Sequence, residues 1–261
     1  MSTPRYGQLR PVTPYASVLL ARNPSPLTLE GTNTWLLRAD GAVSCLVVDP
    51  GPDDPAHLRA VAAAAGRVAE VLLTHGHPDH ADGAAGLHEL TGAPVRALDP
   101  AHRLGGSGLA EGDVVAAAGV EVRVLATPGH TSDSLCFAVG DAVLTGDTVL
   151  GRGTTVVAHP DGRLADYLDS LRRLQDWAHE GGATRTVLPG HGPELPDLAA
   201  VTAAYLAHRE ERLEQVRAAL DQLGPDASAR DVVRVVYAGV DPVLWPAAEW
   251  SVRAQLAYLR E

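Results

Sequence analysis

Five histidines and two aspartates of this chain follow short apolar runs and lie on turns rich in glycine and proline. They occur in four segments: His75-Gly76-His77-Pro78-Asp79-His80 after Val71–Leu73, Thr127-Pro128-Gly129-His130 after Val122–Leu125, Gly146-Asp147 after Val143–Leu144, and Pro189-Gly190-His191-Gly192 after Val187–Leu188. Imidazole and carboxylate groups are side chains that hold Zn²⁺ and similar divalent ions. Seven ligands are too many for one tetrahedral zinc ion, but they suit a pair of ions.

The first of these segments carries the strongest signal. A single histidine is more often a surface or core residue than a metal ligand, whereas His75, His77 and His80 share one six-residue turn with Asp79. The later His and Asp residues are weaker signals one by one, and their repeated position after apolar runs strengthens them together. We therefore predict a metal site built from turns that follow strands.

Hydrophobic periodicity predicts the elements that position these turns. Strands are expected over 17–22, 33–38, 43–48, 68–73, 95–98, 114–117, 120–125, 135–139, 142–145 and 186–188. Helices are expected over 55–65, 84–90 and 163–179. After Pro196, apolar residues at helical spacing predict one long helix that ends at Gly224-Pro225, and further helices are expected over 229–237 and 247–260. Mixed elements followed by helices alone predict an α/β core, residues 1–196, and a small helical module, residues 197–261.

The composition is that of an ordinary globular protein of 261 residues. The net charge of −11 gives no general attraction to nucleic acid or anionic membranes. All 21 basic residues are arginines, so no lysine can act in catalysis or substrate binding. No apolar stretch approaches the ~20 residues that cross a bilayer, and the N-terminal apolar run is too short for a signal peptide. We expect a cytoplasmic protein that does not contact membranes.

The four segments resemble, in order, the motifs of the metallo-β-lactamase superfamily. His75–His80 is similar to the H-x-H-x-D-H signature, and Thr127–Thr131, Thr145–Asp147 and Pro189–Gly192 are similar to the later motifs. Asp49, in Val48-Asp49-Pro50-Gly51, matches the first motif. The resemblance covers about residues 17–195. It implies an αββα sandwich of α/β class, with the metals at one edge where the motif turns converge.

By the pattern of that family, His75, His77 and His130 hold one metal ion, and Asp79, His80 and His191 hold the second. Asp147 bridges the two ions together with a water or hydroxide, and Asp79 also orients that nucleophile. The resemblance thus implies two divalent ions, with zinc as the default, although manganese and iron also accept these ligands. Asp49 has two interpretations: it orients a ligand side chain, or it is a plain turn aspartate.

Three further stretches resemble the beta-lactamase-like protein 2 branch of the superfamily: Asn23–Trp35, Gly151–Thr155 and Asp241–Ala248. In that branch a winged-helix-like module follows the core. Here the wing hairpin is expected to be missing, because the sequence stops just after the third helix of the module. Residues 197–261 carry seven arginines against ten acidic residues, which disfavours binding of phosphate backbones. We interpret this module as a cover over the active-site edge or as a homodimer contact.

These resemblances imply a dinuclear metal-dependent hydrolase whose metal-bridging hydroxide attacks an ester, thioester or phosphodiester bond. Single-stranded RNA endonucleases and acyl thioesterases, including the glyoxalase II type, are the alternatives within this class, so the expected partner is a small-molecule or acyl thioester substrate, or single-stranded RNA. The alternative from another class is a non-catalytic, metal-stabilised binding module. Candidate substrate contacts are Thr32, Asn33, Arg152, Thr154 and His159, of which Arg152 best suits a carboxylate or phosphate.

Overall fold

The computed structural model describes residues 5–157, 159–182 and 184–260, and it divides into two compact units. The first unit contains the described residues of Met1–Ala126, Asp133–Gly153 and Arg185–Pro196. The second contains those of Thr127–Ser132, Thr154–Thr184 and Asp197–Glu261. The domain boundary at residue 196 remains a prediction.

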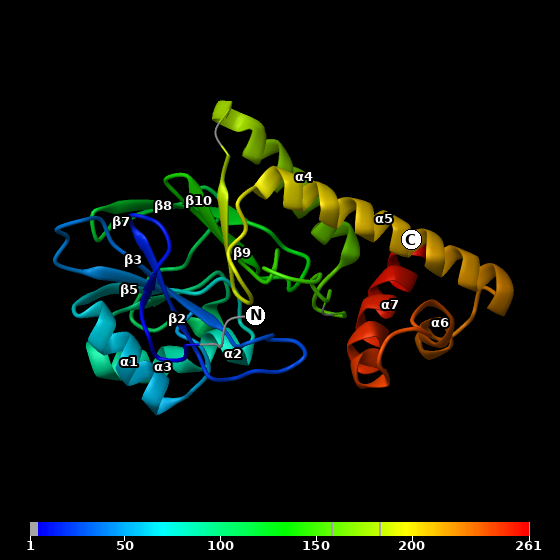
Figure 1. Ribbon diagram of the computed structural model, residues 1–261, viewed down its shortest axis with the longest axis horizontal. Coiled ribbons are helices and arrows are strands. Elements are labelled where there is room, and N and C mark those ends of the chain that lie inside the picture. The colour runs from blue at the N-terminus through cyan, green and yellow to red at the C-terminus, as the bar shows by residue number, and fades with distance from the viewer. Residues whose placement is uncertain (1–4, 158, 183, 261) are drawn as a thin grey trace. The chain divides into compact units, whose positions relative to one another are not determined.

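Two β-sheets form the centre of the first unit (Figure 1). The first sheet has the order β1 (Arg10–Pro11), β2 (Ala16–Leu20), β3 (Asn33–Leu37), β4 (Cys45–Val48), β5 (Val68–Leu72) and β6 (Val95–Arg96). The second has the order β11 (Thr186–Pro189), β10 (Ala142–Gly146), β9 (Leu135–Val139), β8 (Val120–Ala126) and β7 (Val114–Ala117). The pairs β4–β5, β5–β6 and β10–β11 are parallel, and the other pairs are antiparallel.

Alternate residues along the strands divide between two hydrophobic clusters, as the two-residue period of a strand requires. Leu46 and Val48 of β4 join residues of both sheets in one buried cluster that includes Trp35 and Phe137. Cys45 and Val47 of β4 belong to a second cluster. The first cluster is therefore the core between the sheets, and the second lies on the other face of the first sheet.

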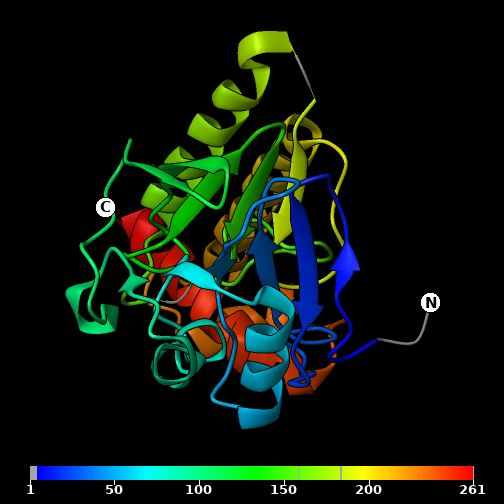
Figure 2. The same ribbon diagram turned by 90° about the vertical axis from the view of Figure 1, so that its left-hand side faces the viewer.

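Helices of the first unit pack against the strands in this second cluster (Figure 2). They are α1 (Pro55–Ala65), α2 (Pro78–Ala81) and α3 (Gly83–Thr91), with a 3₁₀ turn over Pro100–His102. Leu58 of α1 and Leu87 of α3 pack with Val71 of β5. The Asp54 side chain caps α1 by accepting hydrogen bonds from the first free N–H groups.

The second unit is helical. It contains α4 (Leu164–His179), α5 (Leu198–Leu223), α6 (Ala229–Val236) and α7 (Trp245–Arg260), with 3₁₀ turns over Glu180–Gly182 and Pro242–Leu244. The long helix α5 lies along α4 (Figure 1). Val216 of α5, Val232 of α6 and Val252 of α7 share a buried cluster. No strand follows β11 in the described part of the chain.

The structure confirms the predicted elements. Their observed ends differ from the predicted ends by one or two residues in most cases. Two elements were not predicted, β1 and α2. The two residues of β1 are too few to show a period, and α2 lies inside the histidine-rich turn, where ligand-type residues replace an apolar stripe. No helix in the described ranges combines the length and apolar character that a membrane crossing needs.

Replacement of Leu46 by Ala tests the core between the sheets. Leu46 is fully buried, so this truncation is expected to lower the free energy of unfolding by about 2–5 kcal/mol. Val43→Ala is the control, because Val43 is 85% exposed and its truncation should cost less than about 0.5 kcal/mol. Urea unfolding followed by circular dichroism measures both, and equal effects would contradict the assigned core.

Candidate metal centre

Parallel strand pairs bring the predicted ligand turns of the first unit together. Because β4 and β5 are parallel, Asp49 and the turn that starts at Thr74 leave the same edge of the first sheet. In the second sheet β10 and β11 are parallel, so Asp147 and His191 also leave one common edge. Backbone hydrogen bonds join these edges: Leu135 N–H donates to the Thr74 carbonyl at 2.7 Å and Asn33 N–H to the Gly190 carbonyl at 2.8 Å.

Four of the predicted ligands converge at contact distance. His80 Nε2 lies 3.2 Å from His191 Nε2, and the two ring nitrogens lie 3.5 Å and 3.1 Å from Asp79 Oδ2. Asp147 reaches both rings, with Oδ1 3.3 Å from His80 Nε2 and Oδ2 3.4 Å from His191 Nε2. These nitrogen and oxygen atoms therefore surround one small volume.

The spacing of these atoms fits a divalent ion. Zinc holds nitrogen and oxygen ligands at about 2.0–2.1 Å, so neighbouring ligand atoms of a tetrahedral site lie roughly 3.3–3.4 Å apart. The separations of 3.1–3.5 Å among Asp79, His80 and His191 match that spacing. Asp147 offers one oxygen to each of the two rings, so both of its oxygens lie within reach of this group. The residues present therefore fit a divalent metal ion.

A second group forms around the other histidines of the same turn. His75 Nε2 lies 3.0 Å from His77 Nδ1. Ligand atoms of His75, His80 and Asp147 also lie within 4.8 Å of one another. The His75 and His80 ring centroids are 4.3 Å apart. His75 and His77 thus lie next to the first group and could supply ligands for a second ion.

Asp49 does more than close a turn. Its carboxylate is buried and accepts hydrogen bonds from Thr74 N–H at 2.8 Å and from the Thr74 hydroxyl at 2.7 Å. Asp49 Oδ2 also lies 2.9 Å from His80 Nδ1, which donates to it. Of the two interpretations from sequence, this geometry favours the one in which Asp49 orients a ligand side chain.

A repeated hydrogen-bond pattern places an acceptor at Nδ1 of three imidazoles. His80 Nδ1 donates to Asp49, and His191 Nδ1 donates to the Gly31 carbonyl at 3.2 Å. The Thr74 hydroxyl gives its proton to Asp49, so at 3.0 Å it accepts from His75 Nδ1. In proteins the acceptor at one ring nitrogen fixes the tautomer and directs the lone pair of the other nitrogen to a metal.

Asn33 has a structural role that the sequence did not reveal. Its amide donates to the carbonyls of Pro189 and Gly192, at 3.0 and 2.9 Å. The indole N–H of Trp35 donates to the same Pro189 carbonyl at 3.1 Å. These bonds fix the turn that carries His191. Both amide hydrogens of Asn33 are thus used within the fold, and its contact with a substrate remains a prediction.

Gly190 is required by the close approach of two ligands. A Cβ atom at this position would lie 2.7 Å from Asp147 Oδ1 and 2.7 Å from His80 Cε1. Real Cβ atoms do not approach other atoms so closely, so a side chain would push the ligands apart. The Pro-Gly-His-Gly motif thus has a physical reason for its first glycine.

The carboxylates of the cluster control its protonation. Burial lowers the pKa of His191, but Asp147 outweighs burial and raises this pKa to about 9. For His80 burial acts in the same way, and Asp147 and Asp49 raise the pKa well above its usual range. Burial raises the pKa of Asp79, but its hydrogen bond with His191 and the charge of His80 bring this pKa down to about 2. A divalent ion that binds here must therefore displace protons from imidazoles.

His130, the remaining predicted ligand, lies in the second unit and is buried. Its Nδ1 lies 2.6 Å from the Val156 carbonyl, which can only accept, so Nδ1 carries the proton. The other three imidazoles likewise have an acceptor at Nδ1. The membership of His130 in the ligand set remains a prediction, and the pattern of its ring agrees with that role.

The remaining substrate candidates occupy different positions. Arg152 forms an exposed ion pair with Glu30, at 2.8 Å. The Thr32 hydroxyl lies 3.3 Å from Asp79 Oδ2 and accepts from Asn23 at 2.9 Å. Thr154 and His159 belong to the second unit. Contacts between these residues and a substrate remain predictions.

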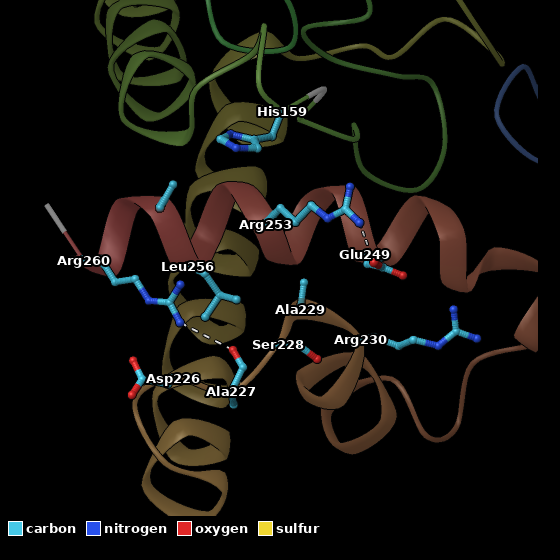
Figure 3. A pocket seen from close by; sticks show the side chains of 11 residues that line it. His159, Asp226, Ala227, Ser228, Ala229, Arg230, Glu249, Arg253, Leu256 and Arg260 are labelled. Atoms are coloured by element: carbon cyan, nitrogen blue, oxygen red, sulfur yellow. Dashed lines mark hydrogen bonds and ion pairs between the residues drawn. The ribbon is translucent and has the colours of Figure 1, made fainter.

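His159 lines a pocket of the second unit with a volume of about 440 Å³ (Figure 3). The figure shows its ring beside α7, the helix that carries Arg253 and Arg260. Both guanidinium groups have partners: Arg253 pairs with Glu249 at 2.6 Å, and Arg260 donates to the Pro225 carbonyl at 3.0 Å. Arg253, Glu249 and Arg260 are thus engaged within the unit.

Comparison with known proteins identifies the family. The metallo-beta-lactamase superfamily matches residues 27–191, and the beta-lactamase associated winged helix domain matches residues 228–261. The chain therefore belongs to the metallo-beta-lactamase superfamily, and it has the α/β sandwich fold of that family with two sheets and helices. Members of the superfamily are hydrolases, so the chain is an enzyme of that class.

Individual relatives cover most of the chain. The beta-lactamase-like protein 2 homolog of Drosophila melanogaster is 30% identical, over 93% of this chain and 87% of its own length. The atrochrysone carboxyl ACP thioesterase of Aspergillus fumigatus is 32% identical, over 85% of this chain and 70% of its own length. A beta-lactamase domain protein of Burkholderia ambifaria superposes with a TM-score of 0.82 at 25% identity, over 99% of this chain and 89% of its own.

Gly190→Ala is expected to weaken metal binding without unfolding the sheets. The added methyl group would displace Asp147 or His80 from the distances that fit an ion, so zinc affinity should fall by about 10-fold or more, the scale seen when ligand support is lost. Titration against a chromophoric chelator measures this. Gly239→Ala is the control, because a Cβ there meets nothing within 4 Å and Gly239, like Gly190, is not among the glycines with positive φ. Equal zinc affinity in both variants would contradict the close packing at Gly190.

Zinc binding by the metal-stripped protein is expected to release protons at pH 7. Asp147 raises the pKa of His191 to about 9, and Asp147 and Asp49 raise the pKa of His80 well above its usual range, so protons must leave these rings when zinc binds. A pH indicator in weakly buffered solution counts them. His191→Ala should release fewer protons, whereas His179→Ala, at an exposed position of α4, should behave as the parent. Zinc uptake without proton release would argue against this cluster as the binding site.

Proposed function

We propose that the chain is a dinuclear, zinc-dependent hydrolase that cleaves acyl thioesters. The observation that carries this proposal is the converged ligand set: Asp79, His80, His191 and Asp147 at the spacing of a zinc site, with His75 and His77 beside them. Support for the substrate class comes from the relative that is named as a thioesterase.

Two bound metal ions would supply water that is acidified enough to attack at neutral pH, and positive charge opposite a developing oxyanion. Six residues would hold them, namely His75, His77, Asp79, His80, Asp147 and His191, and His130 would complete the set. Asp49 holds the ring of His80 in the required tautomer. Asn33 holds the turn of His191. The protein thus supplies a preorganised cluster rather than a nucleophilic side chain.

In the reaction, water adds its oxygen to the acyl carbon, and the bond from carbon to sulfur breaks. Asp79 is the side chain suited to orient this water, because its side chain is 28% exposed whereas that of Asp147 is 12% exposed. The proton of the water passes to the departing sulfur, so that a carboxylic acid and a thiol leave the site. Asp79 can relay this proton, since the Thr32 hydroxyl near its Oδ2 keeps the carboxylate in place.

Charge disfavours the competing substrate, single-stranded RNA. The chain has a net charge of −11, and residues 197–261 carry seven arginines against ten acidic residues. Affinity for a phosphate backbone comes mainly from basic residues that release counterions. A thioester needs no such surface, because its recognition can be local.

The test is an assay of one purified sample against an acyl-coenzyme A panel, nitrophenyl esters and single-stranded RNA. We expect thioester turnover that is lost after chelation and recovered with zinc, and no RNA cleavage. Asp79→Asn should lower kcat by about 10²-fold or more, because it removes the group that orients the water. His179→Ala should leave kcat unchanged.

Each other outcome has a defined meaning. Metal-dependent RNA cleavage with no thioester turnover would replace the proposed substrate by a phosphodiester. A fully zinc-loaded protein that turns over none of the three panels would overturn hydrolysis altogether and favour a metal-stabilised binding module.

A further inference from the structure

Arg209 of α5 is a buried cation without a carboxylate partner. It is 3% exposed, and it forms no ion pair with any acidic residue of the described chain. Its guanidinium donates from Nη2 to the Thr155 carbonyl and lies 5.0 Å from the ring centroid of Tyr167. Burying a charged group this way is costly unless its contacts serve a purpose. A leucine would fill the same space more cheaply.

The two contacts of Arg209 are the two supports of His130. The first is the segment that follows Thr155, because the next residue, Val156, accepts the hydrogen bond from His130 Nδ1. The second is Tyr167 of α4, on which the turn before His130 rests: a Cβ atom on Gly129 would lie 2.2 Å from the Tyr167 Cα atom. One guanidinium therefore contacts both the carbonyl-bearing segment and the helix beneath the turn.

Two further bonds fix the turn that carries His130. The Ser170 hydroxyl of α4 donates to the Pro128 carbonyl at 2.7 Å, and Ser132 N–H donates to Asp161 at 3.2 Å. Neither of them touches the peptide group of Val156. The Val156 carbonyl sets the tautomer of His130. Arg209 holds this segment through its hydrogen bond to the carbonyl of the preceding residue, Thr155.

We propose that Arg209 is a positioning residue for His130: it fixes the Thr155–Val156 segment so that the Val156 carbonyl takes the Nδ1 proton and Nε2, which then carries no proton, can bind a metal ion. This inference rests on the proposed role of His130 as a ligand. It gives the C-terminal helices a role in the hydrolase, because α5 then positions a ligand from outside the residues that match the family.

The arginine fork is suited to this task. Its planar group can donate to a carbonyl while its face lies on an aromatic ring. A lysine keeps the charge but presents a single point of donation. Arg209→Lys should therefore disturb the position of His130 only in part. Arg209→Met, which keeps only the apolar stem, should remove the support fully.

Arg212 provides a matched control on the same helix. Its guanidinium lies 4.6 Å from the ring centroid of Tyr237 and donates to Gln215 at 2.7 Å. Arg212→Met thus removes the same side chain, and the same kind of ring contact, from α5 without touching the segment beside His130.

The experiment combines two measurements on the full chain. Ring ¹⁵N shifts from NMR report the tautomer of His130 in the metal-stripped protein, a readout that needs no metal and no activity. Chelator competition then gives the affinity of each zinc ion. We expect Arg209→Met to mix the His130 tautomers and to weaken one zinc ion by about 10- to 100-fold, with Arg209→Lys between it and the parent, and with Arg212→Met unchanged.

A His130 ring that keeps its single Nδ1–H tautomer in Arg209→Met would overturn the proposal. If Arg209→Met does not fold, Arg209→Lys carries the same test, with the same expected direction. His130→Ala separates this inference from the proposed function. Normal binding of both zinc ions by His130→Ala would remove His130 from the ligand set, and the role of Arg209 toward the metal would fall with it. Weakened zinc in His130→Ala, with unchanged zinc in Arg209→Met, would overturn the role of Arg209 alone.

Discussion

The burial of carboxylates against imidazoles is the interaction on which the rest of this structure depends. Asp49 and Asp147 face His80, Asp147 and Asp79 face His191, and both rings are almost fully buried. Burying a single charged group costs desolvation free energy. This cost is offset only when the group has a partner of opposite charge at hydrogen-bonding distance. The sheets, the turns and the glycine at position 190 can all be understood as the means of holding these partners in register.

The parallel strand pairs are the main structural device for this. Most strand pairs of the two sheets are antiparallel. The pairs β4–β5 and β10–β11, whose strands lead into the predicted ligands, are parallel. This placement follows a general tendency of α/β proteins to carry function at the carboxyl ends of parallel strands. The short connections between edges then allow small supports, such as Asn33 and Thr74, to fix several ligands at once.

The residues that the sequence predicted as ligands of the first unit lie together in the structure, and most predicted elements are present, because both signals are local. Three histidines and an aspartate within one turn can be recognised as a metal-binding pattern without knowledge of the tertiary structure. The spacing of apolar residues likewise indicates strands and helices directly. The supports were missed for the opposite reason. Asn33 and Pro189 are far apart in the chain, and so are Arg209 and Thr155. The sequence around these residues does not indicate the hydrogen bonds that join them. Arg152 suited an anion by type, yet Glu30 occupies it. Type and spacing therefore predict which residues do chemistry, whereas the residues that aim them depend on the folded backbone.

The central claim is that the converged side chains hold two cations. Anomalous scattering at the zinc edge, from crystals of the zinc-loaded protein, tests it most directly. We predict two peaks about 3.5–4 Å apart, with Asp147 between them, His80 and His191 on one peak, and His75 and His77 on the other. A single peak, or two peaks away from these side chains, would contradict the account.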